Sequence, residues 1–195
     1  MKNKRILFLC PHPDDTEFSA GGSIEKWKQD NEIYVMVFSN CGIDNEFRES
    51  MRYYDIINWS IFDFPLRNFN KRRQEILDKL ITLKEIINPD IVILPASIDV
   101  HQDHKVIYQE GIRAFKEKSI LGYEMPWNQF SFHSTYYSVL SQEQINKKLG
   151  SLKIYVSQKD KAYCNSDYML SLATVRGMQV NEKYCETFEI IRWID

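Results

Sequence analysis

The stretch that decides the fold changes from apolar to polar within ten residues: Ile6-Leu7-Phe8-Leu9-Cys10, then Pro11-His12-Pro13-Asp14-Asp15. Its first half is a continuous apolar run, which is typical of a strand buried on both faces of a parallel sheet. A helix-like pattern follows over residues 17–30. A buried strand that leads through a polar turn into a helix is how a parallel α/β sheet begins.

The alternation of strand and helix continues through the first hundred residues. Apolar runs predict further strands at 33–38, around 60–62 and at 91–94, and the clearest helical pattern covers 71–87. We therefore expect an α/β fold, a Rossmann-like three-layer sandwich with a mostly parallel sheet. In such a sheet the first and fourth strands are neighbours where the winding reverses, and ligands bind beyond their carboxyl ends. The Gly21-Gly22 pair is not part of a GxGxxG motif, which argues against a nicotinamide cofactor.

The second half of the chain is less regular. Its patterns predict extra strands and helices, with strands at 119–125, 134–140 and 186–193 and helices at 142–152 and 165–178. No repeat, low-complexity segment or linker interrupts it. With 195 residues, 44% apolar and 27% charged, the chain has the size and balance of one globular domain, which we place at residues 1–195.

Composition also narrows the range of partners. A net charge of −2 gives no electrostatic reason to expect nucleic-acid binding. No apolar stretch approaches the roughly 20 residues that cross a bilayer, and the apolar run at the N-terminus is too short for a signal peptide. The four cysteines have no CxxC spacing, which argues against a zinc ribbon or redox pair. We expect a reduced, cytoplasmic protein without membrane insertion, and a homo-oligomer is compatible with the sequence.

A second polar cluster, Asp99-Val100-His101-Gln102-Asp103-His104, follows the apolar run at 91–95. Three of the four histidines of the protein lie in the two clusters, each beside aspartates. Imidazole and carboxylate are ligands of zinc and similar divalent metals. Either cluster alone could be an ordinary helix start. Because the predicted fold brings the two together, they predict a metal-centred active site.

A hydrolytic metal site needs three protein ligands and one open position for water. The simplest ligand set is His12, Asp15 and His104. Two histidines and one carboxylate are typical of zinc, although the same set would accept iron or cobalt.

The remaining members of the clusters can then take catalytic roles. Asp14 is free to act as general base toward a metal-activated water. His101 could stabilise the oxyanion or protonate a leaving amine, and Asp103 could orient His101.

These residues carry a family resemblance. His12-Pro13-Asp14-Asp15, Gly21-Gly22, Arg48-Glu49 and the Asp99-x-His101-x-Asp103-His104 pattern resemble the LmbE-like (PIG-L) family of metal-dependent N-deacetylases. The resemblance implies zinc at His12, Asp15 and His104, with Asp14 as base and His101 assisting the transition state. It also implies that Arg48 contacts substrate. His133 falls in a segment that lines the substrate pocket of relatives, so it is either a substrate contact or a surface-loop histidine.

The activity that the resemblance implies is zinc-dependent removal of an N-acetyl group from an N-acetylglucosamine-type sugar or sugar conjugate. Two alternatives stay open: hydrolysis of another amide or carbamate, and a metal-dependent binding protein without catalysis. The presence of both Asp14 and His101, which simple metal binding does not need, argues against the second alternative. The chain departs from many members in having Thr16 before Glu17 and Cys41-Gly42 after the second strand. Both departures lie close to the site and bear on the identity of the substrate more than on the chemistry.

Overall fold

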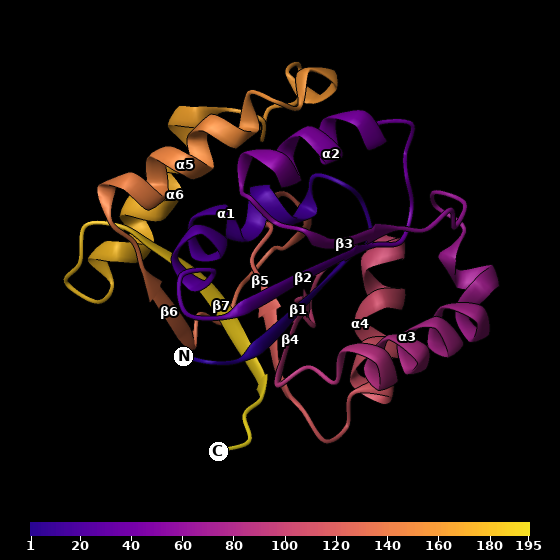
Figure 1. Ribbon diagram of the computed structural model, residues 1–195. Coiled ribbons are helices and arrows are strands. Elements are labelled where there is room, and N and C mark those ends of the chain that lie inside the picture. The colour runs from indigo at the N-terminus through magenta and orange to yellow at the C-terminus, as the bar shows by residue number, and fades with distance from the viewer.

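A single seven-stranded sheet organises the molecule in the computed structural model, which describes residues 1–195 (Figure 1). The strand order is β3-β2-β1-β4-β5-β7-β6. The bounds are β1 Arg5–Cys10, β2 Glu32–Val37, β3 Asn58–Ile61, β4 Ile91–Pro95, β5 Ser119–Tyr123, β6 Tyr136–Val139 and β7 Cys185–Arg192. The first five strands pair in parallel, whereas β7 pairs antiparallel with both β5 and β6. The mostly parallel, Rossmann-like sheet is confirmed, and β1 and β4 are neighbours as predicted.

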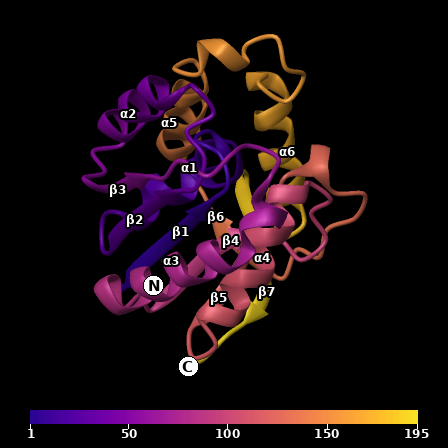
Figure 2. The ribbon, with the colours of Figure 1, turned by 90° about the vertical axis from the view of Figure 1, so that its right-hand side faces the viewer.

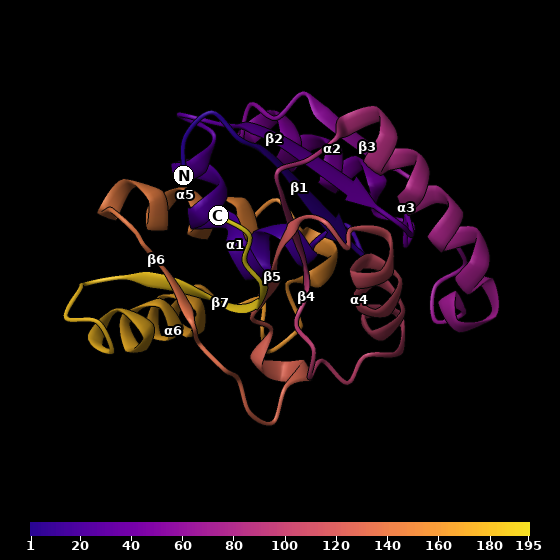
Figure 3. The same cartoon turned by 90° about the horizontal axis from the view of Figure 1, so that it is seen from below.

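Six helices cover the two faces of this sheet. Their bounds are α1 Asp15–Trp27, α2 Asp44–Tyr53, α3 Arg73–Ile87, α4 Gln102–Ala114, α5 Gln142–Leu152 and α6 Ser166–Met178. Helices α3 and α4 lie together on one face, which is turned toward the viewer in Figure 2. The other face carries α1, α2 and α5, and α6 runs alongside β7 (Figure 3). The arrangement is the three-layer sandwich that the sequence predicts.

Strand β1 shows why a continuous apolar run is needed at this place. Its side chains alternate between two separate cores: Ile6, Phe8 and Cys10 pack under α1 and α2. Leu7 and Leu9 pack under α3 and α4. All five are fully buried. A strand that is covered by helices on both faces has no position left for a polar side chain, so the polar residues begin only where the strand ends.

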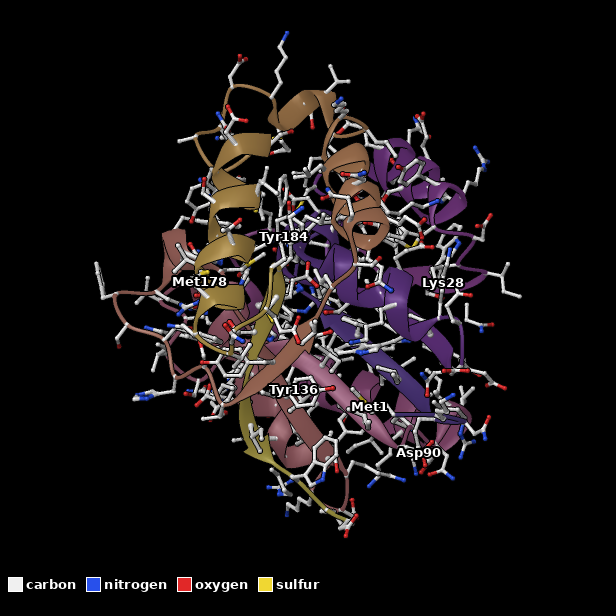
Figure 4. All side chains as sticks on the ribbon, turned by 90° about the vertical axis from the view of Figure 1, so that its left-hand side faces the viewer. Met1, Lys28, Asp90, Tyr136, Met178 and Tyr184 are labelled. Atoms are coloured by element: carbon white, nitrogen blue, oxygen red, sulfur yellow. The ribbon has the colours of Figure 1, made fainter.

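The structure differs from the sequence-based expectation in several places. Helix α4 has no counterpart among the predicted helices, and α3 begins at Arg73 after a 3₁₀ turn, Phe69–Arg72, that overlaps the predicted helix start. The predicted strand 119–125 ends at Tyr123, and a loop with a short 3₁₀ turn, Pro126–Asn128, follows before edge strand β6. Figure 4 shows this edge of the sheet, with Tyr136 on β6 and Tyr184 just before β7. No helix combines the length and the apolar character that crossing a bilayer requires.

Helix α1 is broken in its middle. Ala20 has non-helical dihedral angles, φ −136° and ψ 19°. A break frees backbone groups that must find other partners. The Glu186 carboxylate of β7 accepts hydrogen bonds from the backbone N–H groups of Gly22 and Ser23, at 3.0 and 2.6 Å. The Lys148 ammonium of α5, 2.7 Å from Glu186, neutralises this buried carboxylate. A buried ion pair thus supplies the acceptor for the N–H groups that follow the break in α1.

Candidate metal centre and active site

Three side chains from the two polar clusters converge where β1 and β4 end. His12 follows β1, Asp15 begins α1, and His104 lies in the first turn of α4. His12 Nδ1 is 3.3 Å from His104 Nε2 and 3.5 Å from Asp15 Oδ2. His104 Nε2 is 3.5 Å from Asp15 Oδ1. The sequence places these residues in two segments that lie about 90 positions apart, and the sheet order brings them into contact.

The spacing of these donor atoms suits a metal ion. Zinc bound tetrahedrally at about 2.0–2.1 Å from each donor separates neighbouring donors by about 3.4 Å. The two histidine nitrogens are 3.3 Å apart, and each lies 3.5 Å from a different oxygen of the Asp15 carboxylate. Imidazole nitrogen and carboxylate oxygen are also suitable donors for such an ion. The three side chains are 13%, 5% and 2% exposed for His12, Asp15 and His104, so the site is sheltered but reachable.

Each of the two histidines at the centre is held from behind by a carboxylate. Asp103 Oδ2 lies 3.2 Å from His12 Nε2, and Asp99 Oδ2 lies 2.8 Å from His104 Nδ1. Asp103 is itself fixed by the backbone N–H groups of Arg67 and Phe69, at 2.7 and 3.4 Å. A carboxylate on the far nitrogen of a ligating histidine sets its tautomer and increases its basicity. Asp99, for which the sequence pattern predicts no role of its own, is therefore part of the site.

This geometry corrects the prediction for Asp103. Its carboxylate contacts His12 and not His101. His101 is instead held by the main chain of Asp103, whose N–H donates to His101 Nδ1 at 3.2 Å in the helix cap of α4. The capping hydrogen bond occupies Nδ1 as an acceptor, so the proton of the neutral imidazole is on Nε2. His101 is therefore oriented as a donor through Nε2.

His101 also belongs to a cluster in which nitrogen atoms of His12, His101 and His104 all lie within 4.8 Å of one another. Three histidines are an alternative ligand set. Asp15 is the other candidate for the third ligand, because one of its oxygens lies 3.5 Å from His12 Nδ1 and the other lies 3.5 Å from His104 Nε2.

The surroundings of the two adjacent aspartates shift their pKa values in opposite directions. Burial raises the pKa of Asp14, and the negative charge of Asp15 raises it further. Burial acts on Asp15 in the same direction, but His104 and His12 outweigh it and hold the pKa of Asp15 well below its usual range. Two neighbouring carboxyl groups whose pKa values are driven apart are suited to different roles: Asp15 stays ionised, and Asp14 can take up a proton.

The pKa values of the three histidines are also driven apart. Burial lowers the pKa of His101, and the nearby His104 and His12 lower it further, to about 4. Burial also acts to lower the pKa of His12, but Asp15 and the hydrogen bond to Asp103 raise it to about 9. Burial is likewise outweighed at His104, where Asp15 and Asp99 raise the pKa to about 10. His101 is therefore a neutral hydrogen-bond donor, whereas the other two imidazoles favour a positive partner, a proton or a metal ion.

A cavity of about 220 Å³ opens onto this centre. It is lined by His12, Asp14, Asp15, Phe18, His101, His104, Met125, Trp127, Asn128 and Tyr163. Five of the predicted site residues thus meet in one cavity. The sequence does not predict Tyr163 or Asn128 there, since Tyr163 lies in a loop and Asn128 in a short 3₁₀ turn, and neither segment has a pattern that places it. Trp127 also lines the cavity, while Tyr123 at the end of β5 is fully buried.

Two predicted substrate contacts lie elsewhere. Arg48 pairs with Asp44 at 3.5 Å, and its guanidinium lies 5.1 Å from the ring centroid of Trp59. His133 is exposed in the loop before β6. Neither residue lines the cavity, so a role in contacting substrate stays a prediction for both.

The fold and the site define a class: an α/β protein with a sheltered cluster of histidines and aspartates, suited to a divalent metal, at the switch point of its sheet. The family model described as PIG-L, GlcNAc-PI de-N-acetylase, matches residues 7–115. The chain therefore belongs to the PIG-L (LmbE-like) deacetylase family.

Comparison with individual proteins agrees with this. The chain is 29% identical over 181 residues to the "uncharacterized deacetylase YaiS" of Escherichia coli K12, covering 80% of this chain and 92% of that protein. The N,N'-diacetylchitobiose deacetylase of Pyrococcus horikoshii has a TM-score of 0.79 at 17% identity, covering 96% of this chain and 84% of that one. GalB, the 4-carboxy-2-hydroxymuconate hydratase of Pseudomonas putida KT2440, has a TM-score of 0.79 at 16% identity and covers 98% of both chains. At these identities the likeness to solved structures shows the fold alone, and a fold hosts more than one reaction.

Proposed function

We propose that the protein is a zinc-dependent hydrolase that removes the acetyl group from the amine of an N-acetylglucosamine-type sugar or sugar conjugate. The observation that carries this proposal is the division of roles in the cavity. His12, Asp15 and His104 bring nitrogen and oxygen donors within 3.3–3.5 Å of one another, while Asp14 and His101 line the same cavity. The deacetylase family to which the chain belongs supports the choice of reaction.

The roles follow from the contacts of each side chain. A divalent metal held by the three ligands would lower the pKa of a bound water and polarise the amide carbonyl. Asp14, with its raised pKa, accepts the proton of the attacking water and can return it to the leaving amine. His101 donates from Nε2 to the carbonyl oxygen as negative charge develops there. Because its pKa is lowered, His101 acts as a fixed donor and not as the acid.

The chemistry of the cavity also favours a deacetylase over the hydratase reaction of GalB. That enzyme acts on a compound with several carboxylate groups, as its name states. The cavity of this chain contains two aspartates and no lysine or arginine. A polyanionic substrate would find no lysine or arginine in it beside the imidazoles and the metal that they would hold.

The direct test is a screen of N-acetylated sugars, glycosides and sugar nucleotides with the zinc-loaded protein, in which released acetate is measured. We expect turnover of at least one amino sugar and its loss in Asp14→Asn, which should still bind zinc. If the protein hydrolyses only other amides or carbamates, the proposed substrate class is wrong and the protein is still a hydrolase. Stoichiometric metal binding with no hydrolysis across the panel would contradict the enzymatic proposal and favour a binding protein.

A further inference from the structure

The proposed base, Asp14, is held less directly than its neighbours in the turn after β1. Asp15 accepts the backbone N–H of His12 at 2.7 Å, and the His12 ring lies 3.2 Å from the Asp103 carboxylate. Asp14 stands at the N-cap of α1, yet its carboxylate makes no capping hydrogen bond. The carboxylate lines the cavity instead. Because no capping bond fixes the carboxylate, its direction depends on the backbone of the turn.

The peptide unit between Pro13 and Asp14 is the part of this backbone that decides the direction. Pro13 has no N–H, so its carbonyl oxygen is the only polar backbone group through which this residue can be held. That oxygen accepts a hydrogen bond from the Tyr155 hydroxyl at 2.8 Å. Because the peptide unit is planar, a rotation of it changes ψ of Pro13 and φ of Asp14 together and redirects the Asp14 side chain. The hydrogen bond from Tyr155 opposes that rotation.

Tyr155 can serve as such a support because it is itself fixed. Its side chain is fully buried, and its ring centroid lies 6.1 Å from that of Phe18 in α1. It belongs to the connection between α5 and α6, residues 153–165. Two positions further on, Ser157 donates its N–H and its hydroxyl group to the two oxygens of Glu46 in α2, at 2.9 and 2.6 Å. The connection is therefore tied to α2 next to the buried tyrosine.

We propose that Tyr155 is a positioning residue, whose hydroxyl group holds the Pro13 carbonyl so that the Asp14 carboxylate points into the cavity. The inference rests on the proposed function, in which Asp14 is the base, and it adds a residue that does not line the cavity. A general base must lie within about 2.6–3.2 Å of the proton that it accepts. A rotated peptide unit would therefore slow the reaction while leaving the binding of substrate and metal in place.

Tyr155→Phe removes only this hydroxyl group, and Tyr54→Phe is the matched control. Tyr54 is also fully buried, and its hydroxyl group donates to Ser151 in α5 at 3.0 Å, away from the cavity. Both variants lose one buried hydrogen bond, so we expect similar falls in melting temperature. A hydroxyl group that only satisfies a buried carbonyl would have no further effect.

The kinetic test measures acetate release from N,N'-diacetylchitobiose by the zinc-loaded proteins. For Tyr155→Phe we expect kcat to fall at least tenfold, with KM changed less than twofold and the dissociation constant of zinc less than threefold. Tyr54→Phe should keep kcat within twofold of the unmodified protein. Equal kcat values in the two variants would refute the positioning role. A loss of zinc in Tyr155→Phe would refute it as well, because the hydroxyl group would then support the whole site.

Crystal structures of the zinc-loaded unmodified protein and of Tyr155→Phe test the inference without a substrate. We expect the Pro13–Asp14 peptide unit to be rotated in the variant and the Asp14 carboxylate to be displaced, with His12, Asp15 and His104 in place. An Asp14 carboxylate that keeps its position would overturn the inference. If the unmodified protein releases no acetate from this sugar or from the wider panel, the deacetylase proposal fails, and the two crystal structures still decide the role of Tyr155.

Discussion

Replacing Asp99 with asparagine should weaken zinc binding by about 10- to 100-fold. Asp99 is 1% exposed, and its two oxygens hold two histidines at once. Oδ2 lies 2.8 Å from His104 Nδ1, and Oδ1 accepts the backbone N–H of His101 at 2.8 Å. Asparagine keeps the shape but removes the charge, and its amide nitrogen cannot accept a hydrogen bond. His104 then loses either its fixed tautomer or its support, so its Nε2 is a poorer ligand.

This loss corresponds to about 1.4–2.7 kcal/mol of binding free energy. It can be measured by titrating zinc into the metal-free protein in competition with a chromogenic chelator. Asp78→Asn is the matched control, because Asp78 is exposed on α3 and touches none of the site residues. A dissociation constant for Asp99→Asn within twofold of the unmodified protein, in a variant that melts normally, would refute the proposed support of the metal-binding His104 by the Asp99 carboxylate.

Other predictions concern catalysis, the helix break and the metal. His101→Gln should lower kcat at least 100-fold and change zinc affinity less than threefold, by steady-state kinetics and chelator competition; a large loss of zinc would instead make His101 a ligand. Glu186→Gln should destabilise the fold by about 3–5 kcal/mol in urea unfolding, since it leaves the buried Lys148 unpaired, whereas the exposed Glu143→Gln should change stability by less than about 0.5 kcal/mol, as is usual for surface substitutions. Gly22→Ala should cost about 1–3 kcal/mol, because the added Cβ would lie 2.5 Å from Leu140 Cδ1; an unchanged denaturation midpoint would show that Leu140 moves away freely. Prolonged chelation should abolish acetate release and lower the melting temperature, and zinc should restore both; activity that survives with no residual metal would exclude a metal-dependent reaction.

The position of the site can be predicted from the sequence because the strands that carry it are unambiguous. The apolar runs of β1 and β4 have no polar interruption, and the parallel fold makes their carboxyl ends adjacent. The pattern of the sequence alone therefore brings His12, Asp15 and His104 together. Only the order of the strands in the sheet is needed for this prediction, and that order follows from the alternation of strands and helices along the chain.

Helix α4 escapes prediction because its pattern is weak. Its buried positions include Asp103, Glu110 and Gly111, none of which signals an apolar face. Glu110 is buried only because Arg73 and Arg113 pair with it, and no local periodicity contains that information. The polar residues at the start of the helix indicate a metal site, and nothing in them shows that His101 also serves as the helix cap.

The partner of Asp103 cannot be predicted from the sequence either. His12 and His101 are both near Asp103, and which of them its carboxylate contacts depends on side-chain torsions and on the backbone of the loop at Arg67. Tyr163 is a similar case, since it reaches the cavity from the loop before α6. Contacts of this kind arise from tertiary packing. A sequence pattern predicts the helix or strand that carries a residue, and it does not predict which side chain that residue contacts.

The Glu186 contact with helix α1 has a consequence for how the protein is made. The residues proposed as metal ligands are all synthesised by position 104, yet the carboxylate that supports the break in α1 is Glu186, in the last strand of the sheet to be synthesised. Until β7 docks beside β5, the freed N–H groups of Gly22 and Ser23 lack that acceptor. The contact that supports the break in α1 can therefore form only after β7 has been synthesised, long after the residues proposed as metal ligands.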